Sequence, residues 1–174
     1  MKKFLLEFLI IIFFSSSINY LYAEAPYFID FKYILNESNA GKKAQNSLKS
    51  KLNNGLKNLK EKEKKIQEEE KKIIQQKKLI SPEEYKKKVA ELRKKVSSLQ
   101  SERNKLLENI SKQRTKARNE LLKNLNPILS DYMKKNQIRV ILDKKSILLA
   151  DENLNITDEI IKILNQNLKS IKID

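Results

Sequence analysis

The chain has 174 residues, enough for one domain with an elaboration, and carries 37 Lys and Arg against 22 Asp and Glu for a formal net charge of +15. It contains no His, Cys or Trp and only two glycines. This composition excludes Ser-His-Asp and Cys-His nucleophiles, ordinary zinc, copper and iron–sulfur sites, and a phosphate-cradling loop. We therefore predict a protein that is not an enzyme, with no catalytic residues, metal or cofactor.

The N-terminus has the pattern of an export signal. Lys2 and Lys3 precede an apolar run over residues 4–14, and a small residue, Ala23, stands at a suitable cleavage position. The apolar run is too short to span a bilayer comfortably, which disfavours the alternative of an uncleaved anchor. We expect residues 1–23 to be a cleaved signal peptide and the mature chain, basic and free of thiols, to be exported.

Most of the charge lies in a helical middle zone, residues 40–125, which holds 26 basic and 11 acidic residues. Apolar residues recur there at the heptad spacing of a coiled coil. In the first half they are Leu52, Leu59, Ile66, Ile73 and Ile80, with Leu48 and Leu56 at the second apolar position of the heptad. In the second half they are Tyr85, Val89, Leu92, Val96, Leu99, Leu106 and Ile110. The spacing predicts two long helices, over about 40–78 and 82–125, which pack through this apolar seam.

The break between the helices is marked by Ser81-Pro82-Glu83-Glu84. Ser81 is an N-cap candidate, Pro82 suits the first helical position, and Glu84 stands at the capping-box position. Because the connection is short, the helices should fold back as an antiparallel hairpin, each arm reaching roughly 60 Å.

The flanks, residues 24–39 and 126–174, are nearly neutral and should form a small body. We expect strands over 27–31, 138–142 and 146–150, a turn at 36–38, a continued helix over 127–136, and a helix over 158–168 capped by Thr157. Three short strands leave exposed edges, so the body should be an obligate homo-oligomer with an intersubunit sheet or barrel. The candidate oligomer-body residues are Ile29, Val140, Leu142 and Leu148. The fold class is α+β and predominantly helical.

Several short segments, in this order and spacing, resemble the Skp/OmpH family of periplasmic chaperones over about residues 27–168. The matching segments are Ile29-Asp30, Ile34-Leu35-Asn36-Glu37-Ser38, Gly41-Lys42, Leu79-Ile80-Ser81-Pro82-Glu83-Glu84, Val140-Ile141-Leu142-Asp143, Leu149-Ala150-Asp151 and Ile156-Thr157-Asp158-Glu159-Ile160-Ile161.

The resemblance implies a trimer whose three helical arms surround a cavity in the periplasm of a Gram-negative bacterium. It also implies an ATP-independent holdase that binds unfolded outer-membrane β-barrel proteins and prevents their aggregation. Contact with anionic lipid or lipopolysaccharide is a further implication, although no lipopolysaccharide-binding motif can be matched residue by residue. We expect no nucleic acid partner in vivo.

Three apolar residues beside the seam, Ile74, Leu107 and Leu122, are candidates for client contact. The alternative is that they merely widen the seam between the helices. Some seam positions are charged: Glu63, Glu70 and Lys77 on the first helix and Arg103 on the second. Glu63 and Arg103 could form an ion pair between the arms that loosens the middle of the hairpin.

Basic residues gather in the distal half of the arms, where only Glu83, Glu84 and Glu91 oppose them from residue 71 to 95. We call this set the distal cations and expect it to attract acidic clients or anionic membrane surfaces. The alternative is a solvated face that keeps the coiled coil soluble. The distal cations are Lys71, Lys72, Lys77, Lys78, Lys86, Lys87, Lys88, Arg93, Lys94 and Lys95.

Two other functions remain open from the sequence. A structural coiled-coil or adaptor protein of the envelope would also need long arms and an oligomeric base. A basic nucleic-acid-binding protein would use the Lys-rich helices for phosphate contact, but the export signal and the few aromatics disfavour it.

Overall fold

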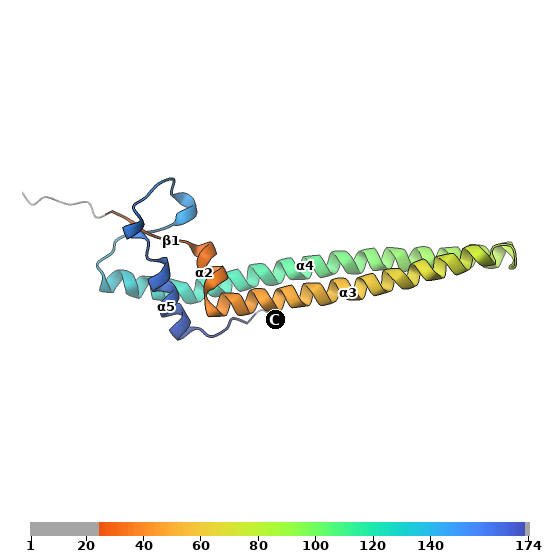
Figure 1. Ribbon diagram of the computed structural model, residues 1–174, viewed down its shortest axis with the longest axis horizontal. Coiled ribbons are helices and arrows are strands. Elements are labelled where there is room, and N and C mark those ends of the chain that lie inside the picture. The colour runs from red at the N-terminus through yellow and green to blue at the C-terminus, as the bar shows by residue number, and fades with distance from the viewer. Residues whose placement is uncertain (1–24, 173–174) are drawn as a thin grey trace, which may run out of the picture.

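The computed structural model describes residues 25–172, so the signal peptide predicted for residues 1–23 lies outside the described part. A long helical hairpin projects from a small body (Figure 1). The elements, in chain order, are β1 (Tyr27–Ile29), α2 (Phe31–Glu37), α3 (Asn39–Gln76), α4 (Pro82–Lys135), β2 (Ile141–Asp143), the 3-10 helices η1 (Lys144–Ser146) and η2 (Glu152–Leu154), and α5 (Thr157–Asn167). The predominantly helical α+β class is confirmed.

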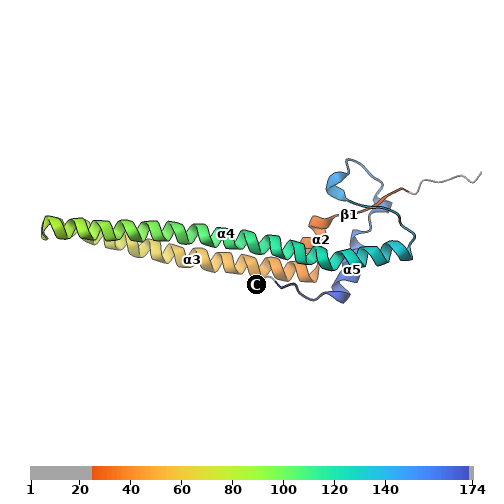
Figure 2. The ribbon, with the colours of Figure 1, turned by 180° about the vertical axis from the view of Figure 1, so that it is seen from behind.

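The hairpin is formed by α3 and α4, which run antiparallel as predicted (Figure 2). The side chain of Ser81 accepts a hydrogen bond from the backbone N–H of Glu84 at 3.2 Å, and Pro82 is the first residue of α4. Pro82 has no N–H to leave unsatisfied in the first turn, and Glu83 and Glu84 carry the negative charge that a helix N-terminus favours. Local sequence therefore sets the tip of the hairpin.

Helix α4 is 54 residues long and extends beyond the end predicted for the second arm helix at residue 125. It continues without a break through Pro127 into the body. It ends in a left-handed turn: Gln137 has φ of 58°, and the N–H of Ile138 donates to the carbonyl of Met133 at 2.9 Å. This is the Schellman arrangement, which satisfies a helix-terminal carbonyl. The continuation predicted over 127–136 is confirmed, and one helix serves both arm and body.

The beginning of the body differs from the expected strand and turn. β1 stops at Ile29 because the side chain of Asp30 accepts from the N–H of Tyr33 at 2.8 Å and starts α2, so Phe31 is helical. The turn expected at 36–38 is reduced to Ser38, which ends α2 and also caps α3. An aspartate cap thus overrides the strand preference of the apolar run.

The sheet has two parallel strands, with Phe28 of β1 opposite Leu142 of β2. The strand predicted over 146–150 is wrong: Asp143 accepts from the N–H of Lys145, the chain turns into η1, and residues 147–151 lie outside any strand. On its other side β1 makes one isolated bridge, between Phe28 and Asn155.

Thr157 is the first residue of α5 and not its cap. Its buried hydroxyl accepts from the backbone N–H of Asp30 at 2.9 Å and donates to Oδ1 of Asn155 at 2.6 Å. A long-range contact between α5 and the β1–α2 junction therefore occupies the side chain that local pattern assigned to capping.

The core of the body is built mainly from its α-helices. Ile34 of α2, Leu121 and Leu125 of α4, and Ile160 and Leu164 of α5 are all fully buried in one cluster. Because α4 contributes two of them, the arm cannot separate from the body without exposing core surface. Within residues 25–172, no helix has the length and apolar character needed to cross a membrane.

Gly41 is required where α2 meets α3. A Cβ at this position would overlap the backbone carbonyl of Leu35, whereas a Cβ at Gly55 would meet only the side-chain carbons of Leu106. We expect Gly41→Ala to lower the free energy of unfolding by about 1–3 kcal/mol, because backbone must move. Gly55→Ala is the matched control, since a side chain can shift there and alanine favours the helix. Urea unfolding followed by circular dichroism measures both; equal stability of the two variants would contradict the packing.

Candidate functional site: the arm surface and the exposed faces of the body

The two arm helices are packed most tightly next to the body. Ala44 and Leu48 of α3 form a buried cluster with Ile110 and Ala117 of α4, which we call the arm-root cluster. Farther out Leu59 is buried, and near the tip Ile73 is buried. The predicted seam is therefore present, although Val96, expected to lie in it, is exposed.

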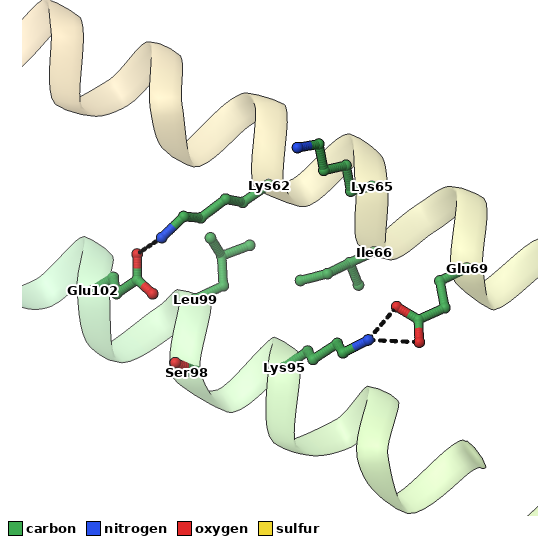
Figure 3. Close-up of a pocket in the computed structure, with 8 residues that line it drawn as sticks. All are labelled: Lys62, Lys65, Ile66, Glu69, Lys95, Ser98, Leu99 and Glu102. Atoms are coloured by element: carbon green, nitrogen blue, oxygen red, sulfur yellow. Dashed lines mark hydrogen bonds and ion pairs between the residues drawn. The ribbon is translucent and has the colours of Figure 1, made fainter.

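Ion pairs between the helices flank a half-buried apolar seam in the middle of the arm. Lys62 and Lys95 reach across on either side of Ile66 and Leu99 (Figure 3). The pairs, with N···O distances, are Lys62–Glu102 at 2.5 Å, Lys95–Glu69 at 2.6 Å and Arg103–Glu63 at 3.9 Å. All six side chains are solvent-accessible, so each pair stabilises by about 0–1 kcal/mol. The Glu63–Arg103 pair predicted from sequence is present, and the mid-arm is held by weak contacts.

Apolar side chains are distributed along the outside of the arm. Ile74 is 60% exposed and Leu107 49% exposed, so the seam leaves both of these candidate client residues accessible. Leu122 differs, because it is half-buried and packs against the body core. The structure adds Leu56, Val96 and Leu79, the last 81% exposed at the turn. Sequence reasoning assigned the first two to seam positions and did not single out the third as a contact residue.

A groove lies between the helices near the tip, with a volume of about 520 Å³. Its lining combines seam residues with exposed ones, so the apolar interior of the hairpin opens directly onto the surface there. The lining residues are Glu70, Ile73, Ile74, Tyr85, Val89, Leu92, Arg93, Val96 and Ser97. Such an open surface suits broad apolar contact more than enclosure of one small molecule.

Nine of the ten distal cations are exposed, and Lys88 is half-buried. Lys88 pairs with Glu84 at 3.4 Å, Lys95 pairs with Glu69, and Lys77 lies over the ring of Tyr85. For the other seven, the described residues provide no ion-pair partner. The tip of the arm therefore presents uncompensated positive charge next to exposed apolar side chains.

Among residues 25–172, two groups have shifted pKa values. A hydrogen bond from Lys112 and its positive charge lower the pKa of Glu108 on the arm surface. Burial raises the pKa of Tyr132, and the negative charge of Glu159 and the nearby Tyr27 raise it further. Neither shift creates a reactive group: one belongs to a surface ion pair and the other to a phenol beside the body core.

The body exposes a second apolar surface at the unpaired edge of its sheet. Val140 and Leu142 are exposed, and Leu148 is fully exposed, whereas Ile29 is buried in the chain's own core. Leu149, next to Leu148, is also 91% exposed. Within the described residues β2 pairs only with β1, so its outer edge has free backbone hydrogen-bonding groups. Three of the four predicted oligomer-body residues are thus accessible on the body.

A family model of OmpH-like outer membrane proteins matches residues 27–164. The chain belongs to the OmpH-like family. This confirms the resemblance derived from the sequence, and the matched region includes the β1 strand, both arms and most of α5. Comparison with curated proteins found no match.

The fold is also similar to a solved structure described as an OmpH-like outer membrane chaperone from Caulobacter crescentus CB15. The TM-score is 0.78, and the alignment covers 88% of this OmpH-like chain and 96% of the other at 19% sequence identity. The similarity therefore extends over arm and body together.

Proposed function

We propose that this OmpH-like protein is a periplasmic, ATP-independent holdase chaperone that binds unfolded outer-membrane β-barrel proteins and prevents their aggregation. The family and the described relative support a chaperone role. The observation that carries the proposal is the arm surface, where Ile74, Leu79 and Leu107 are exposed, the first two of them among the uncompensated distal cations.

This surface has the properties that a holdase requires. An unfolded barrel protein exposes alternating apolar residues and unpaired strand edges over a long chain. Separate apolar side chains along an extended arm can contact many points of such a client, each weakly enough to be released without nucleotide. Mobile lysine side chains between them remain hydrated and also attract acidic segments of the client.

We propose that three chains assemble through their bodies, which places three arms around a common cavity. The exposed edge of β2 can pair with backbone groups of a second body, and the exposed Leu148 and Leu149, which follow η1, offer apolar side chains for it to bury. The number three comes from the family resemblance.

We further propose that the distal cations contact anionic lipid surfaces when the chaperone delivers its client. They lie at the end of the arm farthest from the body, where the charge of three arms would be brought together.

The exposed apolar residues should decide client affinity. We expect Ile74→Ser combined with Leu107→Ser to weaken binding of a barrel protein diluted from urea by roughly tenfold, because apolar contact area is lost. Light scattering measures the aggregation that remains, and fluorescence titration measures affinity. Gln75→Ser with Asn109→Ser is the matched control, since both side chains are exposed and polar. Leu122 is left unchanged because its packing would confound the result.

Retained affinity in the apolar double variant, with helicity intact, would contradict client binding by these residues. A wild-type protein that leaves aggregation of the barrel unchanged would contradict the holdase function itself and favour a spacer or adaptor.

The exposed body face should decide assembly. We expect Leu148→Asp to lower the oligomer mass seen in sedimentation equilibrium, because a charge would be buried against an apolar neighbour. Asn153→Asp introduces the same charge at another exposed position of the body and should leave the mass unchanged. An oligomer that survives Leu148→Asp would place the interface elsewhere.

The distal cations should decide lipid contact. Replacing Lys78, Lys86 and Lys87 by Gln should weaken binding to vesicles of phosphatidylglycerol in phosphatidylcholine, by about 1 kcal/mol per lysine. Flotation measures it, and pure phosphatidylcholine vesicles give the reference. Replacing Lys43, Lys49 and Lys57, which are exposed nearer the body, is the control of equal charge. Binding that persists at high salt, or falls equally in both triple variants, would contradict the proposal.

A further inference from the structure

The chain does not stop at the end of the family match. Residues 165–172 continue beyond it, and after α5 ends at Asn167 they turn back and run toward the base of α3 (Figures 1 and 2). We call residues 165–172 the C-terminal strap.

The first contact of the strap is a cap on the arm. Oδ1 of Asn165 accepts from the backbone N–H of Asn39, the first residue of α3, at 2.7 Å across 126 positions of sequence. The first N–H groups of a helix have no partner within the helix. Ser38 satisfies that of Gly41, and Asn165 satisfies that of Asn39 from the body.

The second contact is apolar and bridges two clusters. Ile171 is half-buried and packs against both the body core and the arm-root cluster. Leu168, three positions earlier, packs against the body core. The strap therefore contacts the hairpin through Asn165 and Ile171 and the body core through Leu168 and Ile171.

The two arm helices are joined to the body differently. Helix α4 passes into the core as one continuous helix, whereas α3 is separated from α2 by Ser38, whose extended backbone interrupts the helix. The base of α3 is thus the side of the hairpin whose position must be secured by tertiary contacts, and the strap supplies two of them.

We propose that the C-terminal strap fixes the angle between arm and body and so sets how far the cavity between the arms can open. Asn165 and Ile171 are its positioning residues. One hydrogen bond and one half-buried side chain are weak enough to break and re-form without unfolding the hairpin. The inference rests on the proposed function only where it concerns the cavity; the restraint of the arm belongs to the single chain.

The restraint can be measured without any client. The chain has no cysteine, so Lys60→Cys on α3 and Lys162→Cys on α5 create one labelled pair, and both positions are exposed. Spin labels on these cysteines report the distance between arm and body by pulsed electron resonance. Labelled chains are diluted with unlabelled ones so that the distance lies within one chain.

We expect Ile171→Ser and Asn165→Ala each to broaden the distance distribution. Lys172→Ser, which changes an exposed neighbour, should leave it narrow. Asn165→Asp keeps the acceptor oxygen and should behave like the parent protein. Hydrogen exchange at the first turn of α3 gives a second readout, and it should be roughly tenfold faster in the first two variants. Unchanged distributions and exchange in both, with the helical circular dichroism retained, would overturn the proposal.

Light scattering with urea-diluted barrels separates the two proposals. If the distance distribution is broader in the strap variants but the parent protein does not suppress aggregation, the strap proposal is supported and the holdase function is contradicted. If the parent protein suppresses aggregation, we compare how strongly each protein suppresses aggregation of large and of small barrels. The ratio of these two values should differ between the strap variants and the parent protein. If the ratio is unchanged although the distance distribution is broader, the arm angle does not determine which sizes of client the protein binds.

Discussion

The structure depends on the burial of Leu121 and Leu125, two residues of one continuous helix, against Ile34, Ile160 and Leu164. The helix that supplies them, α4, also supplies one side of the arm. A long amphipathic helix is unstable alone because its apolar stripe lies in water. By sharing α4, the body anchors the hairpin and the hairpin extends the core, so neither part has to be stable by itself.

From this anchor toward the tip the apolar packing becomes less continuous, although Leu59 and Ile73 remain buried. Buried leucine, isoleucine and alanine close the root, cross-helix ion pairs hold the middle, and a groove opens near the end. Surface ion pairs contribute little free energy and exchange readily with water. The gradient gives the arm a firm base and an adaptable outer half, which suits contact with clients of varied shape.

The small size of the body explains its exposed apolar faces. A parallel pair of three-residue strands and a few helices bury a small core, and β2 keeps a free edge beside Leu148 and Leu149. Surfaces of this kind are normally covered in a stable protein. In the proposed function, assembly with other bodies would cover the apolar surface of the body, and contact with client segments would cover that of the arm.

Local patterns in the sequence were sufficient for the hairpin and its tip, because heptad spacing and the Ser81-Pro82 cap act within a few residues of the chain. They left open whether Ile74 and Leu107 are exposed or widen the seam, and the structure shows both exposed. Local patterns were insufficient where residues far apart compete for the same groups. Asp30 began a helix where a strand was expected, Thr157 bonded to Asp30 instead of capping α5, residues 146–150 formed no strand, and Leu122 joined the body core. The contact of Asn165 with Asn39 spans 126 positions. Only the tertiary structure decides such contacts, because their partners become neighbours only after the hairpin has returned the chain to its base.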